Sequence, residues 1–245
     1  MLADCLVLLA ACSEAPVMQF NPTNRIVLAE FFTFSRCTYC PYAARALDSV
    51  AAESGDSLVV IACHRRVAGD TLSPPCVETR SALYSEATGG EPATVFDGGS
   101  VIRTPGPDYN YETFHNQFLG AKNVRPRAQL EIGGAVWTAA CSVVVRATGV
   151  DSTPTDSLRL FMIIYEDSVR SRMPGNADTI FNHVMRSMLP DENGVPVTLI
   201  PTDTIQIVER FALQPFWNPA RLGAVAFVQD MATRKVLQAA HCRRL

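Results

Sequence analysis

A pair of cysteines directly after a buried strand constrains the fold of the first half of the chain more than any other feature. Residues 25–32 form an apolar run typical of a buried strand, Cys37 and Cys40 follow, and residues 42–53 have the amphipathic spacing of a helix. Pro41 lacks a backbone N–H and is tolerated only near the first helical turn, so the helix must begin at the cysteine pair. A strand, a short loop and a Cys-x-x-Cys at a helix start are typical of a dithiol redox site.

The helix start favours a thiolate at Cys37. Backbone amides without an intrahelical partner and the positive end of the helix dipole stabilise negative charge there. The spacing also lets Cys40 turn back and close a disulfide. We therefore expect Cys37 to be exposed and to attack a substrate sulfur, and Cys40 to be recessed and to resolve the mixed disulfide. Tyr39, between them, is expected to shape the contact surface.

Two other interpretations of this pair remain open. Half of a zinc site is a common use of the motif, but the sequence has no second Cys-x-x-Cys and no His pair at ligand spacing. His64, at the end of the next predicted strand, could complete a copper site with Cys37 and Cys40. A structural disulfide is the second alternative, although so short a loop removes little entropy from the unfolded chain. The redox interpretation requires no metal and no cofactor.

The remaining elements of the first half alternate between strands and helices. Residues 57–63 form a continuous apolar run, typical of a parallel strand buried on both faces, and residues 77–87 have a helical pattern. Residues 91–102 predict a strand, an Asp-Gly-Gly turn and a second strand. Residues 109–119 carry aromatic side chains on one helical face, and Gly120 ends that helix. The predicted order is β-α-β-α-β-β-α.

This order, with a dithiol after the first strand and a proline before the third, resembles the thioredoxin fold. The resemblance implies a cis peptide between Glu91 and Pro92 that faces the dithiol, with the backbone of Glu91 hydrogen-bonding an extended substrate segment. A trans proline that begins an edge strand is the alternative. Glu30 is a candidate proton shuttle for the resolving thiol, because burial would raise the pKa of its carboxyl. Its position is offset by one residue from the buried acid of thioredoxin itself, which in a strand means the opposite face.

After a polar linker at residues 122–128, the pattern changes to strands alone. Turn signals separate seven apolar runs, at residues 130–132, 141–146, 158–165, 182–189, 204–211, 222–230 and 236–240. Short strands at this spacing predict an Ig-like β-sandwich. His183 is expected to be a surface or core histidine and Trp217 a packing anchor. The predicted fold is an α/β thioredoxin-like domain at residues 25–121 followed by an all-β Ig-like sandwich domain at residues 129–245.

The cysteine count favours an oxidising compartment. Eight cysteines are many for a cytosolic chain of 245 residues. Beyond the dithiol, Cys63 and Cys76 lie in the first half, and Cys141 and Cys242 in the second. Two in each half is what two intradomain bridges require, so we predict these as structural disulfides, although the sequence alone does not fix connectivity. Buried free cysteines are the alternative.

The N-terminus predicts export. The apolar run at residues 6–12 ends in Leu-Ala-Ala-Cys, which fits the bacterial lipobox, in which the cysteine, here Cys12, is lipidated. Residues 1–12 are then a lipoprotein signal and residues 13–24 a flexible tether. We expect this signal to be incomplete, because no Lys or Arg precedes the run and Asp4 stands there instead. A buried N-terminal strand is the alternative.

A combination of motifs along nearly the whole chain carries a closer resemblance. The motifs are the lipobox, Glu-Phe-Phe-Thr before Cys-x-Tyr-Cys-Pro, Pro-Ala-Thr-Val-Phe-Asp-Gly, Asn-His-Val-Met-Arg, Val-Ala-Phe-Val-Gln-Asp and Val-Leu-Gln-Ala-Ala. Together they resemble the outer-membrane-protein-28-related bacterial lipoproteins. The resemblance implies a lipid-anchored protein of the cell envelope, on the periplasmic side or surface of the outer membrane, with a thioredoxin-like domain and a β-sandwich.

Two functions are compatible with this sequence. The first is an envelope-tethered thiol–disulfide oxidoreductase for protein thiols or disulfides, with Cys37 attacking, Cys40 resolving and Pro92 beside the substrate. The second is a non-enzymatic surface or assembly lipoprotein whose sandwich binds a partner and whose Cys37–Cys40 pair is a structural bridge. The net charge of −3 without a basic run argues against nucleic acid as a partner.

Overall fold

The structure is a computed structural model that describes residues 25–67, 69–84, 89–104, 106, 110–136, 141–151 and 157–245. Helices labelled η are short 3-10 turns. The elements in chain order are β1 (Val27–Thr33), α1 (Cys40–Ser54), η1 (Gly55–Ser57), β2 (Leu58–His64), α2 (Cys76–Leu83), β3 (Ala93–Phe96), β4 (Ile102–Arg103), α3 (Asn110–Lys122), β5 (Ala128–Val136), β6 (Cys141–Gly149), β7 (Leu158–Glu166), β8 (Val169–Arg170), β9 (Ile180–Phe181), β10 (Val184–Leu189), β11 (Val195–Pro196), β12 (Thr204–Phe211), η3 (Pro219–Arg221), β13 (Leu222–Asp230) and β14 (Val236–Cys242).

The local predictions from the sequence are confirmed at most elements. The predicted strand–dithiol–helix unit is β1 and α1, with α1 beginning at Cys40. The seven runs of the second half are β5, β6, β7, β10, β12, β13 and β14. One helix is longer than predicted, because α3 passes Gly120 and ends at Lys122. The short strands β8, β9 and β11 were not predicted.

A nine-stranded sheet contains strands from both halves of the chain. Its order is β14-β13-β7-β10-β2-β1-β3-β4, with β11 paired to β7. Strand β10 connects the halves, because it is antiparallel to β7 and pairs in parallel with β2 at Val184 and Ala62. The amide of Ala62 also donates to the carbonyl of His183 at 2.8 Å.

The predicted fold class is therefore wrong. A thioredoxin-like domain and a separate Ig-like sandwich would share no sheet, whereas here strands of the first half (β1 to β4) and of the second half (β7, β10, β11, β13 and β14) form one mixed sheet. Strands are the commonest regular structure among the described residues, which contain three α-helices. The physical reason is the edge of β2 that faces away from β1. An unpaired edge exposes backbone donors and acceptors, and β10 from the second half satisfies it.

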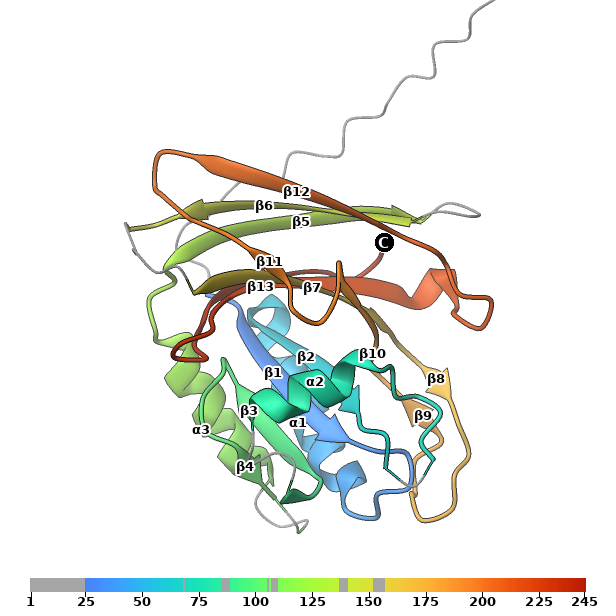
Figure 1. The fold of residues 1–245 in the computed structure, drawn as a ribbon. Coiled ribbons are helices and arrows are strands. Elements are labelled where there is room, and N and C mark those ends of the chain that lie inside the picture. Colours follow the sequence, from blue (N-terminus) through green and yellow to red (C-terminus); the bar gives the residue numbers. More distant parts are fainter. Residues whose placement is uncertain are drawn as a thin grey trace, which may run out of the picture.

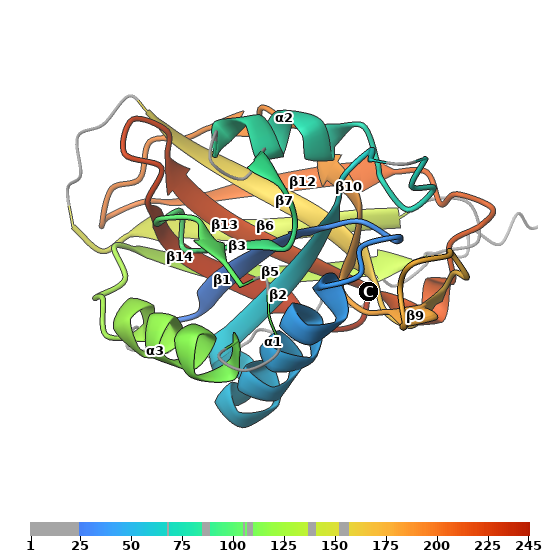
Figure 2. The same cartoon turned by 90° about the horizontal axis from the view of Figure 1, so that it is seen from below.

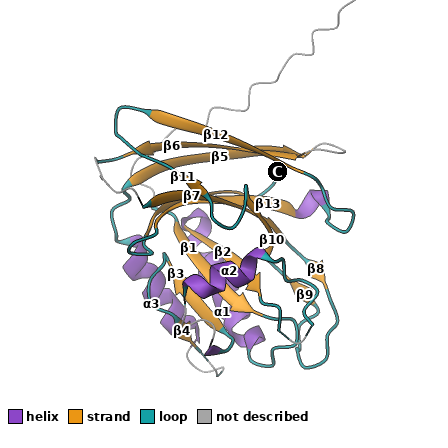
Figure 3. Cartoon of the chain, viewed as in Figure 1, coloured by secondary structure: helices purple, strands orange, loops and turns teal. Residues whose placement is uncertain are grey.

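The strands and helices stack in layers, as Figure 1 and Figure 3 show. A three-stranded sheet, β12-β6-β5, covers one face of β7, β13 and β14. The other face of β7 and β13 packs on β1, β2 and α2. Figure 2 shows that α1 and α3 lie on one side of the strands β1 and β2, whereas α2 lies on the opposite side. The middle layer is thus buried on both faces, which explains the unbroken apolar runs of β7 and β13.

The two faces of β1 and β2 have different surroundings, and the candidate site depends on this difference. Ala29 and Phe31 pack with α1 and α3, on what we call the helix face. Leu28 and Phe32 pack with α2, β7 and β13, on what we call the core face. Because side chains alternate along a strand, each residue of β1 and β2 belongs to one face or the other.

Candidate functional site

The structure contains the predicted disulfide at the start of α1. Cys37 and Cys40 are bonded, with their Cα atoms 5.4 Å apart. Cys40 is the first residue of α1, and Pro41 lies in its first turn, as predicted. The backbone amide of Cys40 donates a hydrogen bond to Cys37 Sγ over 3.1 Å. An unpaired helix-start amide is thus directed at Cys37, which stabilises a thiolate on that sulfur when the pair is reduced.

The expectation of an exposed Cys37 is wrong, because the two cysteines are 3% and 2% exposed. The segment between β8 and β9, from the second half of the chain, lies against the loop that carries Cys37. A side chain at Gly175 would come within 2.8 Å of the Arg36 carbonyl oxygen. Residues on both sides of Cys37 remain exposed, and Tyr39 is 53% exposed.

The proline predicted beside the dithiol has the expected configuration. The Glu91–Pro92 peptide is cis, and β3 begins at the next residue, where Ala93 pairs with Phe32 of β1. Pro92 therefore lies at the end of β1 from which the chain continues to Cys37. The Glu91 carboxylate accepts a hydrogen bond from Arg65 at 2.8 Å. The contact of the Glu91 backbone with a substrate stays a prediction.

Glu30 lies on the core face of β1, away from the dithiol. It is fully buried and accepts hydrogen bonds from Arg80 Nε at 2.5 Å and from the Tyr84 hydroxyl at 2.8 Å. Arg80 also donates to Gln229 of β13, at 2.7 Å. Because α1 and the cysteines pack on the opposite face, Glu30 does not reach the resolving thiol. Its carboxylate is the partner of a buried arginine.

The two other predicted disulfides are not formed, because the four remaining described cysteines are thiols, namely Cys63, Cys76, Cys141 and Cys242. The Cys63 thiol points along its own strand to the Ile61 carbonyl at 3.8 Å, and Cys76 Sγ contacts the Met185 sulfur at 3.9 Å. In the second half, the Cys242 thiol donates to the Arg244 carbonyl at 2.8 Å.

Burial makes the two thiols of the first half poor nucleophiles. It raises the pKa of Cys76 to about 11 and that of Cys63 well above its ordinary value. The predicted lipidation site, Cys12, lies outside the described residues.

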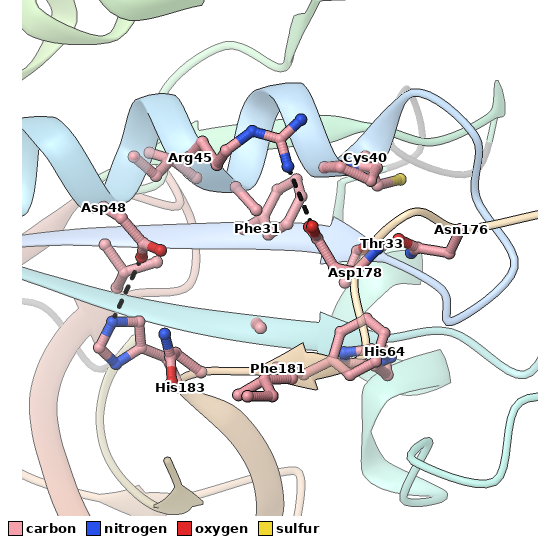
Figure 4. Close-up of a pocket in the computed structure, with 17 residues that line it drawn as sticks. Phe31, Thr33, Cys40, Arg45, Asp48, His64, Asn176, Asp178, Phe181 and His183 are labelled. Carbon is pink, nitrogen blue, oxygen red and sulfur yellow. Dashed lines mark hydrogen bonds and ion pairs between the residues drawn. The ribbon is translucent and has the colours of Figure 1, made fainter. Parts of the chain in front are cut away.

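A cavity of about 180 Å³ adjoins the dithiol on the helix face (Figure 4). It lies between α1, the ends of β1 and β2, and the segment around β9. At its rim Arg45 donates to Asp178 at 2.9 Å, and Asp48 pairs with His183 at 3.7 Å. Its lining comprises Phe31, Thr33, Cys40, Pro41, Ala44, Arg45, Leu47, Asp48, Val60, Ala62, His64, Asn176, Asp178, Ile180, Phe181, Asn182 and His183.

His64, the last residue of β2, is part of this wall and is held by Asp70. His64 Nδ1 lies 2.9 Å from Asp70 Oδ2, and its ring meets Phe181 edge-on. Asp70 also accepts the backbone amides of Ser35, at 2.6 Å, and Leu72, at 2.8 Å. Burial works to raise the pKa of Asp70, but the hydrogen bonds from His64, Leu72 and Ser35 outweigh it and lower that pKa.

Sequence reasoning considered His64 only as a copper ligand and did not find Asp70. In the structure His64 lies on the helix face of β2, with Val60 and Ala62, and Asp70 lies in a loop without a recognisable sequence pattern. Among the described residues, no group of three or more His, Cys, Asp or Glu side chains could hold a metal ion. In the described parts of the chain no helix is long and apolar enough to cross a membrane.

Comparison with known proteins gives structural matches only. No family model and no curated protein sequence matches the chain. HBP35 of Porphyromonas gingivalis has a similar structure, with a TM-score of 0.74, 17% identity, and coverage of 90% of this chain and 76% of HBP35. A structural genomics target from Agrobacterium tumefaciens matches with a TM-score of 0.55 and 13% identity, over 88% of this chain and 92% of its own.

A domain of the outer membrane lipoprotein Omp28 from Porphyromonas gingivalis also matches, with a TM-score of 0.38 and 18% identity over 49% of this chain and 88% of that domain. At these identities the comparisons establish that this chain shares its fold with HBP35. Membership of the lipoprotein family suggested by the sequence motifs stays a prediction.

Proposed function

We propose that this protein exchanges thiols and disulfides with cysteines of other proteins. The observation that supports this most directly is the hydrogen bond from the Cys40 amide to Cys37 Sγ at the start of α1. A thiolate so stabilised is a better leaving group and is populated at lower pH than an ordinary cysteine thiolate. A disulfide placed only for stability has no need of this arrangement.

The exchange proceeds in two steps. The Cys37 thiolate attacks one sulfur of a substrate disulfide, forms a mixed disulfide and releases the first substrate thiolate. The Cys40 thiolate then attacks Cys37 Sγ, which closes the Cys37–Cys40 disulfide and releases the second substrate thiolate. Two electrons pass from the protein dithiol to the substrate, and the reverse sequence donates a disulfide. Exposed Tyr39 and Tyr42 border the pair and form the surface that a substrate contacts first.

The proposed location is the bacterial cell envelope, where the chain is anchored by lipid at Cys12. The sequence supports this location through the lipobox at residues 9–12 and a cysteine content typical of oxidising compartments. With a complete signal peptide, the parent should fractionate with membranes, and a Cys12→Ala variant should become soluble. Equal membrane association of the two proteins would refute the lipid anchor without touching the dithiol chemistry.

One observation favours a second function, in which the disulfide is structural and the protein is a non-enzymatic lipoprotein. Both cysteines are almost completely buried, and poor access slows thiol–disulfide exchange. In that case the described surface would serve a binding partner, and the disulfide would fix the loop between β1 and α1.

Alkylation of the reduced protein separates the two functions. We expect iodoacetamide at mildly acidic pH to label Cys37 at least about tenfold faster than Cys40, because only Cys37 receives the helix-start amide. Cys37→Ser and Cys40→Ser variants assign the two rates, and peptide mapping separates them from the buried Cys63 and Cys76. If iodoacetamide labels Cys37 and Cys40 at equal rates, the result favours the structural bridge. This holds whether those rates are near the rate of an ordinary exposed thiol or far below it.

A further inference from the structure

The side chain of His64 has an unused nitrogen beside the dithiol. His64 is 1% exposed, and its Nε2 is buried without a hydrogen-bond partner among the described residues. Such an atom is costly in a folded protein, because a buried polar group that loses water without gaining a partner destabilises the fold. Buried polar atoms without partners in a native structure therefore call for an explanation.

The hydrogen bonds of Asp70 determine which nitrogen of His64 carries the hydrogen. Asp70 accepts two backbone amides, which favours the ionised carboxylate, and an ionised carboxylate can only accept hydrogen bonds. His64 Nδ1 must then be the donor in the 2.9 Å contact with Asp70. In the neutral imidazole this leaves a lone pair, and so a base, at Nε2.

The cavity gives this base access to Cys40. Cys40 and His64 both line it, and Figure 4 shows them at the end nearest the start of α1. A cavity of about 180 Å³ with polar walls has room for water. The other titratable groups around His64 are already engaged: Arg45 of α1 with Asp178, and Asp48 of α1 with His183 of the β9 segment. Among the described cavity residues, His64 alone has a buried nitrogen or oxygen without a partner.

We propose that His64, oriented by Asp70, accepts the proton of the Cys40 thiol in the second step of exchange. This inference rests on the proposed function. In the mixed disulfide Cys37 is bonded to the substrate sulfur and Cys40 is a thiol, which is a poor nucleophile. Its proton passes through the cavity to His64 Nε2, the Cys40 thiolate attacks Cys37 Sγ, and the bond between Cys37 and the substrate sulfur breaks. The departing substrate thiolate takes up the proton that His64 Nε2 gives back, and His64 is again neutral.

The test separates the two steps with 5,5′-dithiobis(2-nitrobenzoic acid). Cys37 of the fully reduced chain attacks this reagent and releases one thionitrobenzoate, and Cys40 then releases a second by closing the disulfide. A Cys37→Ser/Cys40→Ser variant gives the signal of the other thiols, which is subtracted. His64→Asn keeps a donor for Asp70 and removes the base at Nε2. His64→Gln, measured in parallel, places an amide near Nε2 that is not a base.

The matched control is His183→Asn, at the other end of the same cavity. Asparagine is suited to position 183, where φ is 56°. In both His64 variants we expect the second release at pH 7 to be at least about tenfold slower, with the first release unchanged. In the parent and in His183→Asn, the rate of the second release should reach a plateau with pH. In the His64 variants this rate should rise about tenfold per pH unit, over the pH range in which Cys40 is a thiol.

Equal second-phase rates and equal pH profiles in the parent and a folded His64 variant would overturn the inference. Failure of the proposed function has a different signature, since the parent itself would then show no fast first release from Cys37. Thermal melting of each variant shows whether it is folded, and a variant that does not fold is replaced by the other His64 substitution.

Discussion

Two buried polar clusters lie on opposite faces of β1 and β2, and they differ in one respect. On the core face, Glu30, Arg80, Tyr84 and Gln229 satisfy one another, and Arg80 is also packed over the rings of Phe161 and Phe227. On the helix face, the pair of His64 and Asp70 leaves one nitrogen without a partner, beside a cavity and a disulfide.

The difference distinguishes a cluster that holds layers together from one that is suited to chemistry. A buried polar network in which every group has a hydrogen-bond partner rigidifies a core. A network with an unpaired buried group costs stability, unless that group binds something else. The Glu30 cluster joins β1, α2 and β13 and thereby ties the first half of the chain to the middle layer. The His64 pair lies at the end of β2, and His64 lines the cavity that Cys40 also lines.

The largest effect is expected from Glu30→Leu. This change leaves Arg80 buried without its carboxylate, which costs about 3–5 kcal/mol of unfolding free energy. Urea unfolding at pH 7 measures it. The double variant Glu30→Leu/Arg80→Met removes both charges and should recover a large part of the loss. Glu112→Gln, at an exposed position of α3, should change stability by less than about 0.5 kcal/mol.

The Glu30 cluster on the core face should have no effect on the reactivity of Cys37 and Cys40. Glu30→Leu in its folded state should leave the alkylation rates of Cys37 and Cys40 at the parental values. A Glu30 variant that slows labelling of Cys40 selectively would contradict the separation of the two faces.

A smaller, pH-dependent effect is expected from Asp70→Asn. Loss of a charged acceptor with three donors should cost about 2–3 kcal/mol at pH 7. Because the pKa of Asp70 is lowered in the folded protein, its contribution is present above the pKa of the unfolded chain, near 4, and is lost as the pH falls through the lower folded value. The difference in free energy of unfolding between the parent and the variant should therefore become smaller towards pH 3.

Urea unfolding between pH 7 and pH 3 measures this difference. Asp203→Asn, at an exposed position, is the control and should show no difference from the parent at any pH. If Asp70→Asn lowers the free energy of unfolding by the same amount at every pH from 7 to 3, the Asp70 carboxylate is not ionised in the folded protein. The donor assignment at His64 would then be lost.

The smallest effect is expected from Cys63→Ala on the core face. As a buried thiol, Cys63 contributes as a small apolar side chain, so its truncation should cost about 1 kcal/mol. A structural disulfide with Cys76 would instead make the loss about 2–5 kcal/mol. Unfolding of this variant and of Cys76→Ala, each with and without reductant, distinguishes the two states.

The sequence predicted local elements well because their signals are local. Pro41 and the apolar run before Cys37 placed the start of α1, and the turn chemistry at residues 97–99 placed β3 and β4. The cis Glu91–Pro92 peptide followed from the resemblance of the element order to a known fold. The first two inferences needed only neighbouring residues, and the cis peptide needed only the order of elements within the first half of the chain.

What the sequence did not reveal depends on contacts between the halves. Pairing of β10 with β2 involves few side-chain preferences, so nothing in either strand specified it. One usable signal was missed: β7 and β13 are apolar on both faces, whereas a sandwich strand alternates as β12 does. The segment around Gly175 has no apolar pattern, so its contact with the Arg36 carbonyl, next to Cys37, could not be foreseen.

A redox titration of the Cys37–Cys40 couple tests the central claim most directly. The protein is equilibrated in glutathione or dithiothreitol buffers of defined potential, and the fraction of disulfide is read by alkylation and mass spectrometry, with Cys37→Ser/Cys40→Ser as the blank. An exchanging dithiol should be half-reduced between roughly −120 and −270 mV, the range of known exchange proteins. A pair that stays oxidised below roughly −300 mV is a structural bridge, and that result would contradict the proposed function.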